Sequence, residues 1–454
     1  MNNNIFREYD IRGIVKDDFP DEVVYSIGRA FGQILVANKQ TKVSTSGDIR
    51  HTTNHLKNIL NNGLIDSGLK VFDMGILPTP INYFSLFHTD IKNSIQITGS
   101  HNPKEYNGFK FSMNGKPFFG QQIMEIKEII KNKSIQKVKR KWNIQELEII
   151  DDYIEMIQEK VNIDKKIRCV MDCGNSVAGI VAPKIFKKLN IDLKKIFCDI
   201  NPDFPNHHPD PTVDSNLSDL IDCVKKGNFD LGVAYDGDAD RVVVVDENGG
   251  IIRSDILMSV FVKKIISKED SVIFDVKCSR ALESTIKSLG AKPIMYKTGH
   301  SLIKNKMIEI NSKFGGEMSG HIFFNDKFYG FDDGIYASLR IIEILSSSSS
   351  SLSQLVSEIP KYYSTPEIRL DCDDDKKFEI VENIKKFYVE KYDCNLIDGV
   401  RIEFDYGWGL LRVSNTQPII VCRFEANSEK NLDKIKHIIF DQLKKYGVII
   451  KNEI

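Results

Sequence analysis

The 454-residue chain has no excess of charge of either sign. Its 62 lysines and arginines nearly cancel its 63 aspartates and glutamates, and neither sign is collected into a tail. The global charge therefore gives no support for binding to nucleic acid or to an anionic membrane. We expect no nucleic-acid partner, and we expect any anionic ligand to be held by a local cluster of residues.

Long apolar runs and paired cysteines are also absent. No apolar stretch reaches the ~18 residues that a membrane span needs, and the start "MNNNIFREYD" lacks the apolar core of a signal peptide. The eight cysteines are scattered singly, without a C-x-x-C pair. These absences predict a cytoplasmic protein without membrane contact, whose cysteines are reduced thiols.

The length predicts several domains, since about 150 residues per domain gives roughly three, with four also plausible. Strand signals such as "KVFDMG", "IRCVMD", "KKIFCDI", "DLGVAY" and "SVIFDVK" alternate with helical ones such as "VVYSIGRAFGQILVAN" and "AGIVAPKIFKKL". After about Ser364 the order changes to a strand, a charged helix, three strands and a final helix. We expect three successive α/β domains and a smaller C-terminal α+β domain, with boundaries at 1–147, 148–250, 251–362 and 363–454.

Acidic residues are densest in "DGDADR", where Asp236, Asp238 and Asp240 stand between the apolar runs "LGVAY" and "VVVVD". The pattern predicts two buried strands joined by a tight turn. Mg²⁺ prefers oxygen ligands, and three converging carboxylates repel one another without a cation. A magnesium site is one interpretation, and a solvated acidic turn is the other.

The stretch "ITGSHNP" places Ser100 between Gly99 and His101. A glycine lets a substrate approach the backbone closely, and His101 and Asn102 can donate hydrogen bonds to anionic oxygens beside the hydroxyl. Lys110, further along the chain, could neutralise charge on a phosphoryl group in transfer. Taken alone, the stretch is more typical of a turn.

Eight motifs together resemble a known family. In chain order they are "FREYDIRG", "TGSHNP", "INPDFPNHHPDPT", "DGDADR", "DVKCSR", "TGHSLIK", "GGEMSGH" and "RVSNT". Their order over nearly the whole chain resembles the α-D-phosphohexomutase superfamily, and in particular its bacterial phosphomannomutase/phosphoglucomutase branch. The resemblance implies an α/β fold of three similar domains, with mixed sheets between helices, and a smaller fourth domain around a central cleft.

The resemblance also implies roles for individual residues. Ser100 would carry the transferred phosphate, and one Mg²⁺ would lie between it and Asp236, Asp238 and Asp240. The remaining residues implied in catalysis are Arg12, Lys110, His101, Arg241 and His300, the last also as a proton carrier. Those implied in substrate binding are Tyr9, Lys277, Glu317, Ser319, His321, Arg412, Ser414, Asn415 and Thr416.

The implied activity is that of an isomerase that transfers phosphate within a sugar. It would interconvert hexose 1-phosphate and hexose 6-phosphate, of mannose, glucose or both, through the phosphoserine and a hexose 1,6-bisphosphate that serves as intermediate and activator. Its partners would be small hexose phosphates, and the chain would act as a monomer or a dimer. Three other functions on the same fold stay open: a phosphoglucosamine mutase, a metal-dependent sugar phosphatase and a non-catalytic sugar-phosphate binder.

One position departs from the family's pattern. Where the family often has arginine ahead of the aspartate in "GRDxR", this chain reads "SGDIR", with Gly47 before Asp48 and Arg50. The "FREYDIRG" start and the methionine in "GEMSGH" favour the phosphomannomutase/phosphoglucomutase branch over the phosphoglucosamine mutases, which tend to read "FGTDGIRG" and "GEQSGH".

Overall fold

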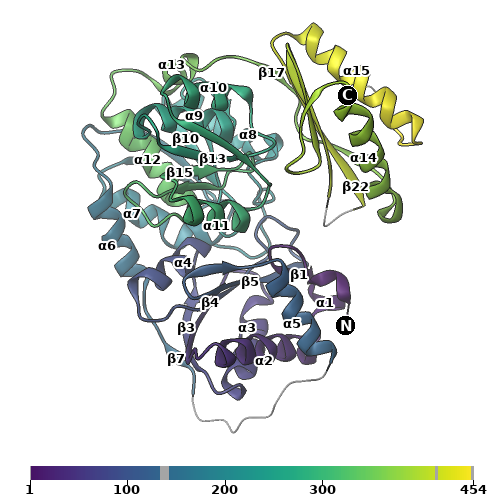
Figure 1. Ribbon diagram of the computed structural model, residues 1–454. Coiled ribbons are helices and arrows are strands. Elements are labelled where there is room, and N and C mark those ends of the chain that lie inside the picture. Colours follow the sequence, from purple (N-terminus) through teal and green to yellow (C-terminus); the bar gives the residue numbers. More distant parts are fainter. Residues whose placement is uncertain (1, 133–142, 415–417, 451–454) are drawn as a thin grey trace.

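The computed structural model describes residues 2–132, 143–414 and 418–450. It contains four β-sheets, each flanked by helices (Figure 1). The first sheet lies at the bottom of the view in Figure 1, the second and third lie above it, and the fourth stands apart at the upper right. Within these described residues, no helix combines the length and the apolar character that crossing a bilayer requires.

The first three sheets repeat one strand order. Each has three parallel strands, with the first in the centre, and a fourth strand antiparallel to the third; the orders are β3-β2-β4-β5, β9-β8-β10-β11 and β14-β13-β15-β16. This repetition confirms the expected three similar α/β domains with mixed sheets. The strands are β2 (Lys42–Gly47), β3 (Lys70–Ile76), β4 (Ser94–Ile97), β5 (Tyr106–Met113), β8 (Arg168–Asp172), β9 (Asp192–Ile196), β10 (Leu231–Tyr235), β11 (Val242–Asp246), β13 (Ser271–Asp275), β14 (Lys292–Tyr296), β15 (Phe314–Gly316) and β16 (Ile322–Phe324).

Short strands extend the edges of the first two sheets, and helices cover their faces. The edge strands are β1 (Ile11–Ile14), β6 (Lys116–Phe118), β7 (Gln145–Glu146) and β12 (Ile251–Ile252). The helices of this part are α1 (Val15–Asp18), α2 (Asp21–Ala37), α3 (Thr53–Asp66), α4 (Thr79–His88), α5 (Gln121–Lys131), α6 (Ile150–Lys160), α7 (Ala182–Lys188), α8 (Ser218–Gly227), α9 (Ser254–Ile265), α10 (Arg280–Ser288), α11 (His300–Ile310), α12 (Gly334–Ser346) and α13 (Leu352–Ser357), with 3₁₀ turns at Asn3–Ile5, Val177–Ile180 and Asp214–Leu217.

The periodic segments formed the elements that the sequence predicts, with two local corrections. In α2, Val24, Ile27, Phe31 and Ile34 are buried at helical spacing, so one face of the helix packs on the first domain's core. The strand predicted from "KKIFCDI" is shifted: β9 ends at Ile196 because the next residue, Phe197, has a left-handed backbone with φ of 50°.

The helix predicted from "AGIVAPKIFKKL" is the second correction. The structure divides it into a 3₁₀ turn and the short helix α7. Pro183 occupies the first turn of α7, where its missing N–H costs nothing, whereas one turn further into a continuous helix it would remove a hydrogen bond.

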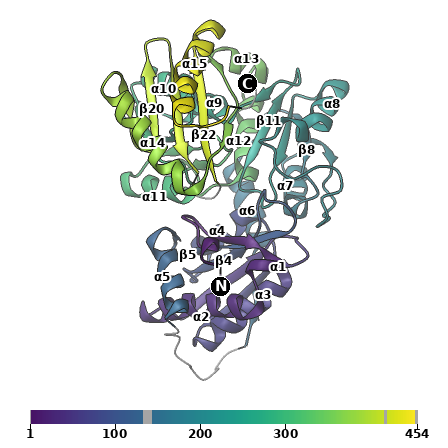
Figure 2. The ribbon, with the colours of Figure 1, turned by 90° about the vertical axis from the view of Figure 1, so that its right-hand side faces the viewer.

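The fourth sheet has six strands and is antiparallel throughout, as expected for the α+β domain. Helices α14 and α15 pack against it, and Trp408 and Leu410 contact Val276 of the third domain. Figure 2 shows this sheet in front of the third domain. Its elements are β17 (Tyr363–Ser364), β18 (Ile368–Asp371), α14 (Asp374–Val389), β19 (Asp393–Asn395), β20 (Val400–Phe404), β21 (Gly407–Val413), β22 (Ile419–Ala426) and α15 (Glu429–Lys445).

A single apolar core continues from the second domain into the third. It includes Tyr235 of β10, Phe274 of β13 and Ile342 of α12. The hydroxyl groups of Tyr235 and Ser338 of α12 lie 2.7 Å apart, so α12 is joined to the second sheet although it follows the third in sequence. The predicted domain boundaries accordingly stay a proposal.

Candidate active site

Three loops at equivalent places in the three sheets form the centre of the site. Each loop joins the third parallel strand to its antiparallel neighbour: residues 98–105 between β4 and β5, 236–241 between β10 and β11, and 317–321 between β15 and β16. The loops contain "TGSHNP", "DGDADR" and "EMSGH". Because the strand order repeats, each domain contributes the same turn, and the packing of the domains brings the three turns together.

Ser100 is buried, with 1% of its surface exposed, and lies against the acidic loop. Its Oγ donates a hydrogen bond to Asp236 Oδ2 at 2.9 Å and lies 3.2 Å from His101 Nδ1. Its backbone φ is 48°, a left-handed conformation that costs energy for any residue but glycine. Such strain is maintained only where neighbouring structure holds the backbone in place.

Asp48 and Arg50 supply that support, and sequence reasoning did not assign it to them. Arg50 donates hydrogen bonds to the carbonyl groups of Ser100 at 2.8 Å and of Asn102 at 2.6 Å, and also to those of Pro103 and of Tyr106 at the start of β5. Asp48 accepts from Thr98 Oγ1 at 2.8 Å and lies 3.2 Å from Arg50 Nε. The aspartate and arginine of "SGDIR" therefore hold the loop at 98–105 that carries Ser100.

The structure shows why glycine fits before this pair. A Cβ atom at Gly47 would overlap the Cγ2 methyl of Thr53, so the arginine that the family often has here would have no room. Thr53 in turn donates to Asp48 Oδ1 at 2.6 Å. Thr53 thus occupies the space that a side chain at position 47 would need, and it also helps to hold Asp48.

The three carboxylates of Asp236, Asp238 and Asp240 converge, with ligand atoms within 4.8 Å of one another, and all three are fully buried. Lys110 Nζ lies 2.7 Å from Asp238 and 2.6 Å from Asp240. Thr79 of the first domain also donates to Asp238, at 2.5 Å.

One lysine does not neutralise this cluster. Burial and the neighbouring Asp240 and Asp238 carboxylates raise the pKa of Asp236 well above its usual range. Asp238 Oδ1 and Asp240 Oδ1 are buried without a hydrogen-bond partner among the described residues. Hard divalent cations prefer oxygen ligands, and the negative charge of these three carboxylates is not balanced by Lys110 alone. The group therefore has the composition and spacing to bind a metal ion.

A cavity of about 730 Å³ opens beside these loops. Of the residues expected in the site, its lining includes Tyr9, His101, Arg241, Lys277, His300, Glu317, Ser319 and His321. Burial and the nearby Asp275 raise the pKa of Glu317 to about 7, and its carboxylate accepts the Gly299 N–H at 2.5 Å. The cavity is therefore polar and lies between loops of different domains, as a binding site for a small polar ligand would.

Cations and domain contacts border the cavity. Arg241 Nε donates to His321 Nε2 at 2.9 Å and lies 3.8 Å from Asp236. Tyr9 of the first domain donates its hydroxyl to the Thr298 carbonyl at 2.6 Å, in the third domain. These contacts join the loop at 236–241 to the loop at 317–321, and the N-terminal motif to the third domain, around one space.

Five other expected residues lie elsewhere or are not described. Arg12 on β1 pairs with Asp10, and Arg412 Nε lies 3.1 Å from Asp398. The Ser414 carbonyl accepts from Lys377, and none of Arg12, Arg412 or Ser414 lines the cavity. Asn415 and Thr416 lie outside the described residues.

Sequence reasoning missed several cavity residues. Glu367 of the fourth domain lies 3.3 Å from Lys277, and Arg423 donates to the Lys277 carbonyl. Asp210 of "INPDFPNHHPDPT" also lines the cavity. That motif was an available signal for Asp210, whereas Glu367 and Arg423 belong to strand-like segments in which nothing distinguishes them from surface charges.

Comparison with known proteins agrees with this geometry over the whole chain. Four models of phosphoglucomutase/phosphomannomutase domains match in order: alpha/beta/alpha domain I at 3–137, domain II at 151–250, domain III at 253–363 and the C-terminal domain at 367–442.

Whole proteins match at similar extent. The phosphomannomutase/phosphoglucomutase of Pseudomonas aeruginosa is 41% identical over 97% of this chain and 96% of its own, and the phosphoglucomutase of Neisseria meningitidis serogroup A is 37% identical over 96% and 95%. The crystal structure of a phosphoglucomutase/phosphomannomutase family protein from Burkholderia thailandensis superposes with a TM-score of 0.92 at 36% identity, covering 98% of each chain. The chain belongs to the phosphoglucomutase/phosphomannomutase family.

Proposed function

We propose that this protein interconverts hexose 1-phosphate and hexose 6-phosphate, with Ser100 as the carrier of the phosphoryl group. The observation that carries the proposal is the hydrogen bond from Ser100 Oγ to Asp236 Oδ2, which places an alcohol against a buried three-carboxylate cluster. The names of the relatives, phosphomannomutase and phosphoglucomutase, support the same reaction class.

The chain's residues suit phosphoryl transfer. This reaction needs in-line positioning and neutralisation of the equatorial oxygens more than covalent assistance. We propose Mg²⁺ as the resident metal, held by Asp236, Asp238, Asp240 and the Ser100 oxygen, where it would supply positive charge to the transferring group. Lys110 and Arg241 add charge from the protein itself, at the cluster and at the cavity wall.

The reaction runs as two transfers. A hexose hydroxyl takes the phosphate from Ser100, which gives a hexose 1,6-bisphosphate. This intermediate reorients in the cavity, and the serine oxygen then takes the other phosphate. We propose that Arg412, Ser414, Asn415 and Thr416 grip the phosphate that is not being transferred, because a phosphate dianion presents the same oxygens at either end of the sugar.

The cavity must also exclude water throughout the catalytic cycle, because water would hydrolyse the phosphoserine. We expect the fourth domain to close over it, carrying Arg412 to the bound phosphate. We further propose a cytoplasmic location and a monomeric or dimeric state, of which the second is measurable by light scattering.

Glucose and mannose are the proposed sugars, since they differ only at C2. The proposed reader of the sugar is Glu317, whose carboxylate can accept hydrogen bonds from O3 and O4, which both sugars present alike. We expect kcat/KM for mannose 1-phosphate and glucose 1-phosphate to differ by less than about a hundredfold. A ratio beyond about a thousand would show that a buried group reads the C2 hydroxyl.

Ser100→Ala tests the proposal. The variant should stay folded and lose orders of magnitude in kcat, and protein purified from cells should carry a partial phosphate adduct that maps to Ser100. The wild-type enzyme, given glucose 1-phosphate, Mg²⁺ and a trace of glucose 1,6-bisphosphate, should form glucose 6-phosphate without releasing phosphate. Steady phosphate release would indicate a phosphatase, no turnover a binding protein, and a fully active alanine variant would refute the role of the serine.

A further inference from the structure

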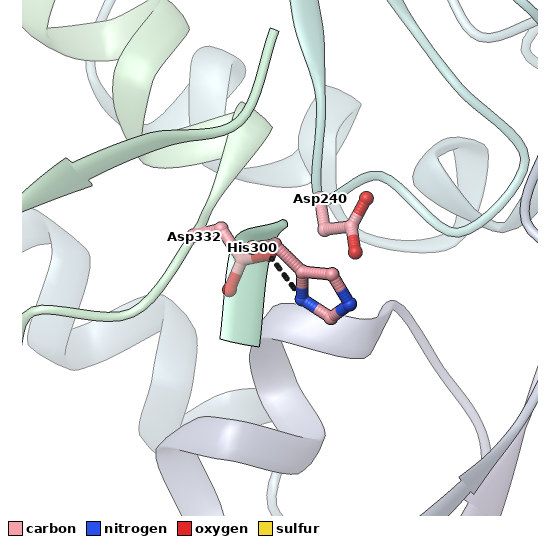
Figure 3. A group of neighbouring side chains, drawn as sticks. All are labelled: Asp240, His300 and Asp332. Carbon is pink, nitrogen blue, oxygen red and sulfur yellow. Dashed lines mark ion pairs between the residues drawn. The ribbon is translucent and has the colours of Figure 1, made fainter. Parts of the chain in front are cut away.

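Asp332 is a buried carboxylate that the family motifs do not include. It lies in the segment between β16 and α12, and none of its surface is exposed. Its Oδ1 is 2.7 Å from Lys304 Nζ, and its Oδ2 is 3.3 Å from His300 Nδ1 and 2.9 Å from His321 Nδ1. Figure 3 shows the His300 ring with its Nδ1 edge toward Asp332.

The two histidines are arranged as a pair in front of this carboxylate. Their rings stack with centroids 5.1 Å apart and planes 16° from parallel, and both rings line the cavity. Each ring therefore has its Nδ1 atom close to the same Asp332 oxygen, although the angle of neither contact is that of a hydrogen bond in this structure. Lys304 holds the other oxygen and lies 3.6 Å from the centre of the Tyr83 ring, which helps to fix the lysine.

The partners of His321 determine where its proton lies. Arg241 Nε donates to His321 Nε2 at 2.9 Å, and a guanidinium nitrogen has no capacity to accept. A neutral His321 must therefore have its lone pair on Nε2 and its proton on Nδ1, which faces Asp332.

The charges around Asp332 suit a proton acceptor. Burial alone would raise the pKa of Asp332, but Lys304 and the two histidines hold it well below its usual range. Burial also lowers the pKa of His300, so this ring is neutral at neutral pH. An ionised carboxylate faces a neutral ring whose Nδ1 proton it can accept.

We infer that Asp332 is a positioning residue, which holds the Nδ1 protons of His300 and His321. It thereby leaves the Nε2 lone pair of His300 to take a proton from substrate, while that of His321 accepts from Arg241. This inference rests on the proposed mutase function. In the first transfer the hexose O–H bond breaks, an N–H bond forms at His300 Nε2, a hexose O–P bond forms and the Ser100 O–P bond breaks. In the second transfer the serine oxygen attacks the other phosphate, and the imidazolium returns its proton to the released sugar oxygen.

A second metal ion is the rival interpretation of this cluster. Asp240, His300 and Asp332 offer ligand atoms within 4.8 Å of one another. However, Lys304 already pairs with Asp332, and Asp240 belongs to the carboxylate group proposed to hold Mg²⁺, so a second divalent cation would be repelled by both the Lys304 ammonium and the first ion. The charge balance favours an orienting carboxylate.

The neighbouring residue offers a matched control. Asp333 is equally buried, but its carboxylate faces the other way: it accepts the backbone N–H of Tyr336 at 2.8 Å and the hydroxyl of Tyr153 at 2.7 Å. It caps the N-terminus of α12. Two adjacent aspartates thus allow the orienting and the structural roles to be tested separately.

The experiment compares Asp332→Asn with Asp333→Asn in the full-length enzyme. We expect Asp332→Asn to lower kcat about a hundredfold with KM within about twofold of wild type, because its amide presents a donor where the histidines need an acceptor. Asp333→Asn should keep kcat within about twofold of wild type and change only the melting temperature. A kcat for Asp332→Asn within about threefold of wild type would overturn the inference, as would a loss confined to KM.

A second measurement needs no variant of Asp332. Nitrogen-15 spectra of the wild-type histidine rings, assigned with His300→Gln and His321→Gln, should show both rings protonated at Nδ1 when neutral. Rings protonated at Nε2 would overturn the inference even if the Asp332 variant failed to fold. Failure of the mutase proposal would be seen separately, as absence of turnover by the wild-type enzyme.

Discussion

Gly237 lies where the acidic loop at 236–241 touches the Ser100 loop at 98–105, and a methyl group there should disable the enzyme without unfolding it. A Cβ atom at position 237 would lie 2.9 Å from the carbonyl carbon of Ser100 and nearer still to its oxygen. Carbon atoms that are not bonded need about 3.5 Å, which the carbonyl carbon misses by about 0.6 Å and the nearer carbonyl oxygen by more, so the two loops would have to separate by about 1 Å. A misplacement of that size at a reacting centre costs about a hundredfold in rate, or about 2.7 kcal/mol of activation free energy.

The assay follows the formation of glucose 6-phosphate from glucose 1-phosphate, at saturating Mg²⁺ and bisphosphate. Gly237→Ala should lower kcat about a hundredfold, with a melting temperature close to that of wild type. The control is Gly115→Ala, in the turn between β5 and β6, where a Cβ atom would meet nothing within 4 Å, although the backbone φ of 73° disfavours alanine there. It should keep kcat within about twofold. An active Gly237→Ala enzyme would show that the spacing of the two loops does not govern the rate.

Three further predictions follow from neighbouring groups. Excess chelator should abolish turnover reversibly and Asp238→Asn should weaken metal binding measured by calorimetry, whereas unchanged activity in chelator would make "DGDADR" an acidic turn without a metal. Arg50→Lys should lower kcat, and it should lower the melting temperature by several degrees, because lysine lacks the planar guanidinium that donates to several carbonyl groups. A fully active, equally stable variant would contradict the role of Arg50. Burial raises the pKa of Asp333 from 3.8 to about 7, so between these pH values the folded state keeps a proton that the unfolded chain releases. Wild type should therefore lose stability relative to Asp333→Asn as the pH rises from about 4 to about 7. Melting temperatures that differ by a constant amount across this range would contradict the prediction.

The sequence by itself carried the class of fold and the nature of the chemistry. Apolar runs such as "LGVAY" and "VVVVD" are buried strands, and the polar turn between them holds three carboxylates, as their order along the chain predicts. This worked because burial and periodicity are local: each strand or helix leaves its pattern within a few consecutive residues. The local predictions were wrong where a single residue decided the backbone, as at Phe197 and Pro183.

Only the tertiary structure decided which single polar residues support the site. Arg50 reaches the carbonyl of Ser100 across fifty positions, and Thr79 reaches Asp238 across 159. Asp332 meets His300 and His321 from a segment with no motif of its own. An isolated polar residue has no periodic pattern, and its partner is chosen by how the sheets and domains pack, so the sequence holds the chemistry of these contacts while the folded chain alone places them together.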